Sequence, residues 1–233
     1  MKTIFLIRHA ESVANSGERN PDPNQAELSS FGHQQAEQLA ETLRTMDIPA
    51  IYYSRFPRTQ LTAAPFLKIR SHMTKQVLPI HEFTHREPAT VKHTTEQERR
   101  KLWEEYWGRN DPEATDGPNS ESFIALTARI RRFTMILKSL PNRSAVFGHG
   151  RFFTLWGVQM EYPEADFLNG IQKEPDIKAR QTSNSLAKEL MQLSANRLLV
   201  EKKNFANAQI VPFEVSEETI TCSAPNFGAV TLP

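Results

Sequence analysis

The sequence is poor in cysteine and in long apolar runs, and each shortage excludes a class of protein. Cys222 is the only cysteine among 233 residues, so an internal disulfide and a cysteine-based metal cage are both excluded. No stretch reaches the roughly 20 apolar residues that a membrane-spanning helix needs. Only five apolar residues precede Arg8, which is too few for the apolar core of a signal peptide. We therefore expect a soluble, cytoplasmic protein.

The sequence also lacks an excess of charge of either sign. It carries 28 Lys and Arg against 27 Asp and Glu, a formal net charge of +1. Such a balance produces no global field toward nucleic acid or an anionic membrane, so neither is expected as a partner. Internal repeats and low-complexity tracts are missing as well. The length favours one α/β domain over residues 1–233, and it leaves the oligomeric state open.

Short apolar segments alternate with amphipathic ones along most of the chain. The run from Thr3 to Ile7 is too short for a typical helix and rich in bulky or β-branched residues, which favours a buried strand. Helical periodicities separate it from later runs of the same kind. The other expected strands are residues 50–53, 76–80, 144–147, 208–213 and 218–223. This order predicts a three-layer αβα sandwich around a mostly parallel sheet, with helical insertions at about residues 84–118 and 160–204.

Basic side chains follow several of these strands at the end where each strand stops. Arg8 and His9 follow the first strand, and His149 follows the strand at 144–147. Arg58 stands in a segment after residues 50–53, in which Pro57 suits the first turn of a helix. The carboxyl ends of parallel strands form the usual ligand crevice of such sheets. Guanidinium groups bind phosphate oxygens in pairs, and a neutral imidazole can attack phosphorus. The alternative is that these residues are polar strand ends that turn into solvent.

Taken in order, these segments resemble the histidine phosphatase superfamily, whose founding members are cofactor-dependent phosphoglycerate mutases. The resemblance covers most of the chain and depends on ordered motifs. The first is Arg8-His9-Ala10-Glu11-Ser12 with Asn15 after it. The later ones are Leu28-Ser29 through Gly32 and Gln35-Ala36, Ser54-x-x-x-Arg58-Thr59-x-x-Thr62-Ala63, Gly117 through Glu121-Ser122-Phe123, His149-Gly150, and Phe205-Ala206-Asn207-Ala208.

The resemblance implies a role for each matching residue. His9 would be the nucleophile and would form a phosphohistidine. Arg8, Arg58 and His149 would bind the transferring phosphoryl group. A carboxylic acid near residue 82 would protonate the leaving oxygen and then activate water. Residues implied to assist at the substrate are Ser12, Asn15, the Gly150 backbone and Glu121, and neither a cofactor nor a metal is implied.

Glu82 is the first choice for this acid, because it stands where the family glutamate usually follows the third strand. Glu87 is the other candidate, in a more polar stretch beside Pro88. The sequence departs from the family at Ala10, where glycine is usual, and in Thr84 through Pro88, where the usual glycines after the acid are missing. The extended motif that marks true phosphoglycerate mutases is also absent.

These departures favour a phosphatase that acts on a small phosphorylated metabolite through a phosphohistidine. Two alternatives stay open: a phosphoglycerate mutase-like phosphotransferase and a catalytically silent phospholigand-binding module. A third comes from His81-Glu82-Phe83-Thr84-His85, a formal His-Glu-x-x-His zinc hydrolase signature. That chemistry needs both histidines on one helix, and Pro79 and Pro88 leave little room for one.

Other polar and aromatic residues have two interpretations each. Glu121 with Ser120 could line the site or favour the start of a helix. Several basic side chains are expected at the surface, where each could contact the part of the substrate beyond the phosphate: Arg55, His85, Arg86 and Arg151. Aromatic and leucine stripes at helical spacing are expected to pack in the core or at an interface: Trp103, Tyr106 and Trp107, and Leu186, Leu190 and Leu193.

Overall fold

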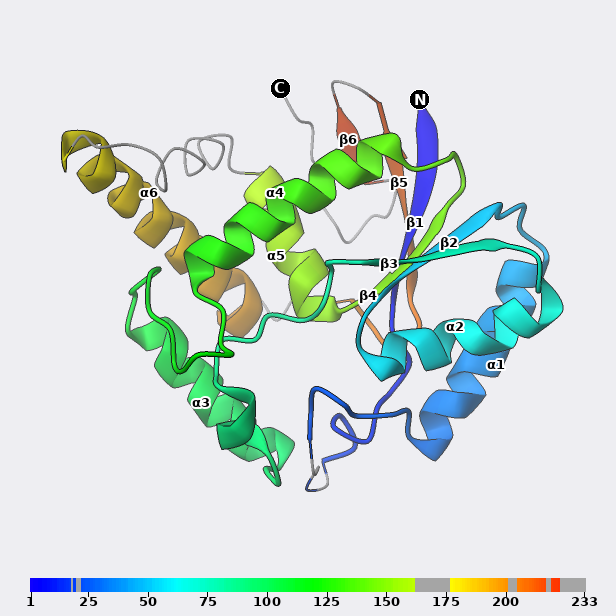
Figure 1. Ribbon diagram of the computed structural model, residues 1–233, viewed down its shortest axis with the longest axis horizontal. Helices are drawn as coiled ribbons and strands as arrows, with labels where there is room; N and C mark the ends of the chain where they lie inside the picture. The colour runs from blue at the N-terminus through cyan, green and yellow to red at the C-terminus, as the bar shows by residue number, and fades with distance from the viewer. Residues whose placement is uncertain (18, 20–21, 162–176, 201–204, 217–218, 223–233) are drawn as a thin grey trace.

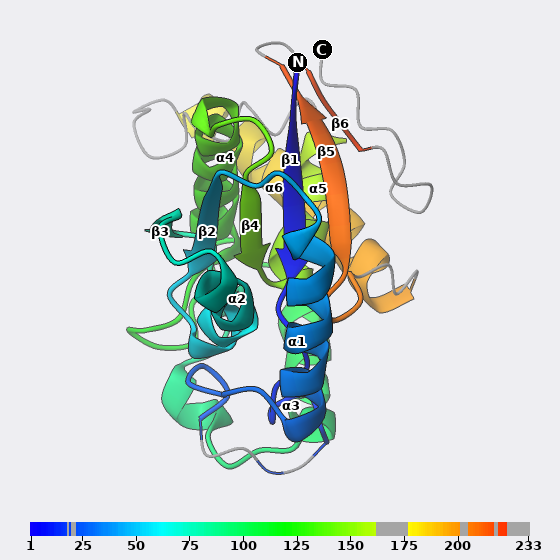
Figure 2. The same cartoon turned by 90° about the vertical axis from the view of Figure 1, so that its right-hand side faces the viewer.

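The computed structural model describes residues 1–17, 19, 22–161, 177–200, 205–216 and 219–222, and these form a single sheet with helices on both faces (Figures 1 and 2). The order of the strands in this sheet is β3-β2-β4-β1-β5-β6. Their bounds are β1 Lys2–Arg8, β2 Ala50–Ser54, β3 Thr74–Leu78, β4 Ala145–Gly148, β5 Ile210–Val215 and β6 Ile220–Cys222. Strands β1 to β4 are parallel, whereas β5 and β6 are antiparallel to their neighbours.

Helices cover the sheet in two layers. Helices α1 and α2 lie on one face, and α4, α5 and α6 lie on the other (Figures 1 and 2). Helix α3 lies beyond the carboxyl ends of the parallel strands in both views. The helix bounds are α1 Ser30–Arg44, α2 Pro57–Ile69, α3 Glu96–Gly108, α4 Phe123–Ser139, α5 Gly150–Met160 and α6 Ile177–Ala195, with a 3-10 turn η1 Pro88–Val91 and a π-helical turn η3 Asn196–Val200. This arrangement confirms the predicted αβα sandwich.

Side chains of the central strands alternate between the two helical layers, as the pleat of a strand requires. In β1, Ile4 and Leu6 belong to the core cluster under α4, α5 and α6, whereas Ile7 belongs to the cluster under α1 and α2. Strand β4 repeats the pattern, with Val146 on the first side and Phe147 on the second. Both faces are therefore buried, which explains the continuous apolar runs in the sequence.

The register of the two central strands places both histidines of the sequence motifs side by side. Arg8 pairs with Gly148 across the parallel β1–β4 ladder. His9 and His149 follow these residues directly, and the His9 backbone N–H donates to the Gly148 carbonyl at 3.0 Å. The two side chains therefore leave the sheet at the same edge.

Local signals in the sequence account for where several helices begin. The Ser29 side chain accepts from the Gly32 amide at the start of α1, and Pro57 occupies the first turn of α2. The third strand differs from the prediction: it covers 74–78 rather than 76–80. Pro79 has no N–H to donate to a ladder, so strand pairing ends before it.

The predicted insertion at 160–204 contains α6, and residues 162–176 lie outside the described part. Of the expected leucine stripe, Leu190 is buried, Leu186 is half-buried and Leu193 is exposed. Across the described residues, no helix is both long enough and apolar enough to cross a membrane.

Gly32 allows α1 to approach the loop that follows His9. A Cβ at this position would lie 1.9 Å from the Glu11 carbonyl oxygen, which is a backbone atom and cannot move alone. That carbonyl also accepts from the Ser29 amide at 3.0 Å. The glycine therefore allows the start of α1 to pack against the segment that follows His9.

We expect Gly32→Ala to lower the free energy of unfolding by roughly 1–3 kcal/mol, because the added methyl group overpacks a closed contact. Gly157→Ala in α5 is the matched control, since a Cβ there meets nothing within 4 Å. The control should raise stability by about 0.5–1 kcal/mol, the usual helical preference for alanine. Urea denaturation of both variants checks this, and equal stabilities would contradict the close approach.

Candidate active site

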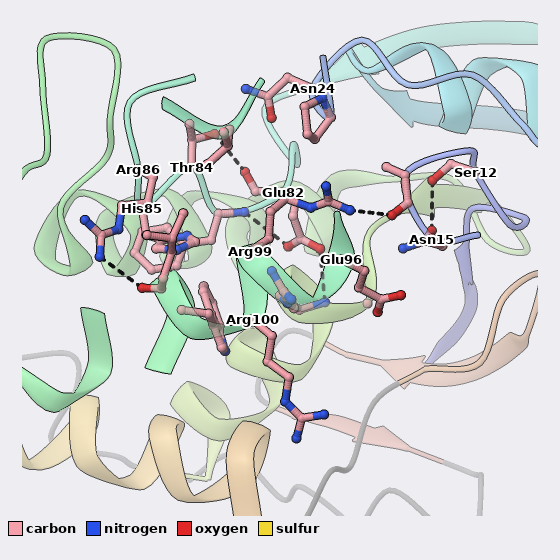
Figure 3. Close-up of a pocket in the computed structure, with 18 of the residues that line it drawn as sticks. Ser12, Asn15, Asn24, Glu82, Thr84, His85, Arg86, Glu96, Arg99 and Arg100 are labelled. Carbon is pink, nitrogen blue, oxygen red and sulfur yellow. Dashed lines mark hydrogen bonds between the residues drawn. The ribbon is translucent and has the colours of Figure 1, made fainter. Parts of the chain in front are cut away.

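A cavity of about 400 Å³ opens at the carboxyl ends of the parallel strands (Figure 3). Most of the site residues predicted from the sequence line it, namely Arg8, His9, Ser12, Asn15, Arg58, Glu82 and Gly150. His149 does not line the cavity but contacts His9 directly, with the two ring centroids 5.1 Å apart. Residues from four separate segments therefore meet at one place.

His9 is held in one orientation by its two ring nitrogens. Its Nδ1 lies 2.7 Å from the Ala10 carbonyl oxygen, and Nε2 accepts from Arg58 Nε at 3.3 Å. A carbonyl can only accept, so Nδ1 carries the proton and Nε2 keeps its lone pair. Burial, followed by the charges of Arg58 and Arg8, holds the pKa of His9 well below its usual range. The imidazole is therefore neutral, and its lone pair is on Nε2.

Arg58 is buried and Arg8 is half-buried, and apart from the His9 ring their protein acceptors are backbone carbonyls. Arg58 Nη1 donates to the Pro23 carbonyl at 3.0 Å, and Arg8 Nη1 donates to the Phe205 carbonyl at 2.5 Å. Neither group has a carboxylate within ion-pair distance among the residues that the structure describes. Burial lowers the pKa of Arg58 to about 10, so it remains charged at neutral pH. The charge of Glu82 acts on both groups without forming an ion pair with either. The two cations outnumber this carboxylate beside the cavity, which predicts an anionic ligand.

The Arg8 guanidinium has an unsatisfied nitrogen and lies close to the backbone of Gly150. Its Nε is buried and has no hydrogen-bond partner in the described part of the chain. A Cβ on Gly150 would lie 3.1 Å from both Cδ and Nε of Arg8. A side chain at position 150 would therefore crowd the guanidinium.

His149 lies behind His9 and is completely buried. Its Nε2 is 2.9 Å from Ser54 Oγ, and its Nδ1 has no hydrogen-bond partner among the residues that the structure describes. Burial is the largest cause that holds the pKa of His149 well below its usual range, and the charge of Arg58 adds to it. The ring is therefore neutral, and one of its two nitrogens is unsatisfied within the described residues.

Glu82 lines the cavity and also satisfies the start of α5. One carboxylate oxygen accepts from the Phe152 amide at 3.0 Å and from the Phe83 amide at 3.1 Å, and the other lies 3.4 Å from the Arg151 amide. The first amides of a helix lack partners within the helix, so a carboxylate is stable there. Glu87, the other candidate acid, is outside this cavity and accepts from the backbone and side chain of Asn119.

Glu121 is not brought to the cavity, so the structure does not support its predicted contact with the substrate. Its carboxylate binds Arg129 through two hydrogen bonds of 2.6 and 2.8 Å. The same guanidinium donates to the His81 carbonyl at 2.7 Å. The Glu121–Arg129 pair therefore anchors the backbone immediately before Glu82. Helix α4 is capped by Ser122 instead.

One other expectation is wrong. His85 and Arg86 were expected at the surface, but both are buried and line the cavity, because α3 folds over the segment that contains them. Residues 81–85 form no helix, so the His-Glu-x-x-His motif lacks the helix that its zinc chemistry requires. The described residues contain no group of three or more potential metal-ligating side chains.

Some lining residues carry no sequence signal of their own. Arg99 and Trp103 come from α3, and Leu198 comes from the η3 turn of the 160–204 insertion. Helical periodicity predicts only that Trp103 packs in the core, which it does. Its place beside the cavity depends on how α3 docks, which short-range patterns do not contain.

Comparison with known proteins matches residues 4–168 to the family model of the histidine phosphatase superfamily (branch 1). A probable phosphoglycerate mutase, GpmB, of Enterobacter sp. (strain 638) is 40% identical over 63 residues, which cover 27% of this chain and 29% of that protein. The chain spans less than a third of the length of the curated relatives it matches.

Solved structures resemble the chain over nearly all of its length. An alpha-ribazole phosphatase from Shigella flexneri superposes with a TM-score of 0.66 at 16% identity, covering 99% of each chain. A phosphoserine phosphatase from Entamoeba histolytica, solved with 3-phosphoglyceric acid, has a TM-score of 0.60 at 16% identity, covering 96% of each chain. At such identities the likeness shows the fold alone.

We expect the imidazoles of His9, His85 and His149 to remain neutral at pH 5.5, because burial lowers the pKa of each well below 6.5. The unfolded chain takes up protons on these residues below about pH 6.5, whereas the folded protein does not. The free energy of unfolding therefore decreases as the pH falls below about 6.5, because protons bind to these histidines only in the unfolded chain. Above pH 6.5 the three histidines are neutral in both states and the effect is absent. Imidazole nitrogen NMR shifts measure the neutral state directly, and titration of all three near pH 6.5 would contradict it.

Proposed function

The chain belongs to the histidine phosphatase superfamily, and from this membership we propose that it hydrolyses a small phosphorylated metabolite through a phosphohistidine on His9. The observation that carries the proposal is the neutral Nε2 of His9, which lies beside two guanidinium groups without carboxylate partners. A phosphomonoester has a dianionic phosphate group that the two cations can bind. It also has an electrophilic phosphorus that the imidazole can attack.

In the first step, the Nε2 lone pair of His9 attacks phosphorus while the bond from phosphorus to the ester oxygen breaks. Arg8 and Arg58 bind the equatorial oxygens. The His149 ring, which contacts His9, donates its unpartnered Nδ1–H to the same phosphoryl group. The bound dianion repels the carboxylate of Glu82 and offsets the charges of Arg8 and Arg58, so Glu82 acts in its protonated form. It gives its proton to the departing oxygen, and an alcohol leaves. The guanidinium groups carry the charge stabilisation that metal ions supply in other phosphoryl transfers.

In the second step, water attacks the phosphorus of phosphohistidine. Glu82, now a carboxylate, accepts a proton from this water, and the bond from phosphorus to Nε2 breaks. Inorganic phosphate leaves, and both His9 and the acid return to their starting states. The capping contacts of Glu82 hold the carboxylate beside the cavity through both steps.

Phosphoryl transfer to a second hydroxyl is the alternative outcome of the same intermediate. The local identity to a probable phosphoglycerate mutase favours it, whereas the missing extended motif around the acid favours water as acceptor. Inorganic phosphate released per molecule of alcohol formed distinguishes them: a ratio near one means hydrolysis, and a ratio near zero means transfer.

His9→Ala should abolish release of phosphate from 4-nitrophenyl phosphate between pH 5 and 8, because no other neutral imidazole is free to attack from that position. His33→Ala, which removes an exposed histidine of α1, is the matched control and should keep wild-type turnover. Full activity in His9→Ala would exclude the mechanism. Wild-type protein without any turnover would favour a silent phospholigand-binding module, and activity lost to a chelator with stoichiometric zinc would favour the zinc alternative.

Glu82→Gln should slow hydrolysis of an alkyl phosphate by about 100-fold or more, because an alkoxide leaves poorly without a proton donor. The loss with 4-nitrophenyl phosphate should be smaller, since its leaving group needs less protonation. The amide oxygen of glutamine can still accept from the start of α5, which protects the fold. Glu87→Gln is the control, and equal effects of the two substitutions on both substrates would remove Glu82 from the mechanism.

A further inference from the structure

The cavity extends past the phosphate-binding arginines to a wall formed by α3 and the first turn of α5 (Figure 3). The charged side chains that line the whole cavity are the arginines Arg8, Arg58, Arg86, Arg99, Arg100 and Arg151 and the glutamates Glu82 and Glu96. Positive charge is therefore in clear excess. Some of these arginines already form ion pairs with carboxylates of the protein, and others do not.

Two of the arginines beyond the phosphate site have carboxylate partners. Arg86 is buried between Asp116 and Glu105, at 3.0 and 2.9 Å. Arg100 pairs with Glu104 one helical turn away, at 3.2 Å. Neither is available to an anion without breaking an existing pair, which leaves Arg99 and Arg151.

Arg151 is held in place without being neutralised. Its guanidinium lies over the Trp103 ring, 4.3 Å from the centroid, and no carboxylate is within ion-pair distance among the described residues. Trp103 is itself fixed, because it is 3% exposed and packs edge-on to His85 at 4.5 Å. A stacked guanidinium keeps all its hydrogen-bond donors while losing little freedom on binding a ligand.

Arg99 is also bound only to neutral acceptors. One end of its guanidinium donates to the Ala14 carbonyl and the other to the Thr94 carbonyl, both at 2.5 Å. Glu96 lines the same cavity but forms no ion pair with it. Burial is the largest cause that lowers the pKa of Arg99, and among the nearby charges Glu96 raises it while Arg151 lowers it. Arg99 and Arg151 line the same cavity without a carboxylate partner in the described part of the chain, so an anion bound there would accept hydrogen bonds from both.

We propose that Arg151 and Arg99 form a second anion subsite, so that the preferred substrate is a phosphomonoester whose leaving group ends in a carboxylate or a second phosphate. The inference rests on the proposed function, because it names the substrate class of that site. The subsite is on the leaving-group side, since the Arg151 backbone amide contacts Glu82, the acid that protonates the departing oxygen.

A matched series of substrates tests the subsite. The compounds are 3-carboxypropyl, 3-phosphonopropyl and 3-carbamoylpropyl phosphate, which share one leaving alcohol and differ in the charge of its far end. We expect kcat/KM for at least one anionic member to exceed that of the carboxamide by about tenfold or more, the usual worth of a charge-assisted hydrogen bond. The carboxylate and phosphonate members distinguish the two sources of the anion.

Arg151→Gln should lower the ratio of kcat/KM for the anionic substrate to kcat/KM for the carboxamide toward one. Arg99→Gln, tested as a separate variant, should lower the same ratio. Arg132→Gln removes the same charge from an exposed position on α4 and should keep the wild-type preference. Added salt should also weaken the preference, as it does for any accessible ion pair. Circular dichroism of each variant checks that it is folded.

Equal kcat/KM across the series, or a preference that both Arg151→Gln and Arg99→Gln retain, would overturn the subsite while leaving the phosphatase intact. If no member is hydrolysed, the proposed function fails instead. Calorimetric binding of the same three compounds then decides the subsite: tighter binding of an anionic member that Arg151→Gln loses supports it, and equal binding contradicts it.

Discussion

The parallel pairing of β1 with β4 is the constraint on which the rest of the site depends. It places Arg8 opposite Gly148, so that His9 and His149 emerge together at the carboxyl edge of the sheet. Everything else is arranged around that pair. Helix α2 brings Arg58 to Nε2 of His9, and the start of α5 holds Glu82 beside the cavity. A shift of one residue in this ladder would move a side chain to the opposite face and dismantle the site.

The cost of this arrangement is electrostatic. Two guanidinium groups and two imidazoles lie together, and besides one another they find only carbonyl or hydroxyl oxygens as hydrogen-bond partners among the described residues. Both imidazoles stay neutral. The arginines stay charged, and the unsatisfied Nε of Arg8 belongs to a side chain that lines the cavity, where an anion could satisfy it. Burial therefore acts on the proposed nucleophile and on the proposed anion site by the same physical effect.

Short-range patterns predict a large part of this structure. The apolar run before Arg8, the cap at Ser29 and the proline at position 57 depend on neighbours in the sequence, and each lies in the predicted element. The converging histidines follow from a general rule about parallel sheets. Residues that depend on contacts between distant segments were predicted poorly. Glu121 binds Arg129 rather than the cavity, and His85 is buried because α3 docks above it, which no local pattern contains.

The central claim is that His9 accepts the phosphoryl group, and the most direct measurement is the site of phosphate on the enzyme during turnover. Protein mixed with a phosphomonoester, quenched in alkali and digested can be mapped by mass spectrometry, since phosphohistidine is stable to base and labile to acid. The proposed mechanism predicts one phosphoryl group on the peptide that contains His9, lost on acid treatment. Phosphate on another residue, or turnover with no phosphorylated peptide and no burst of alcohol release, would contradict it.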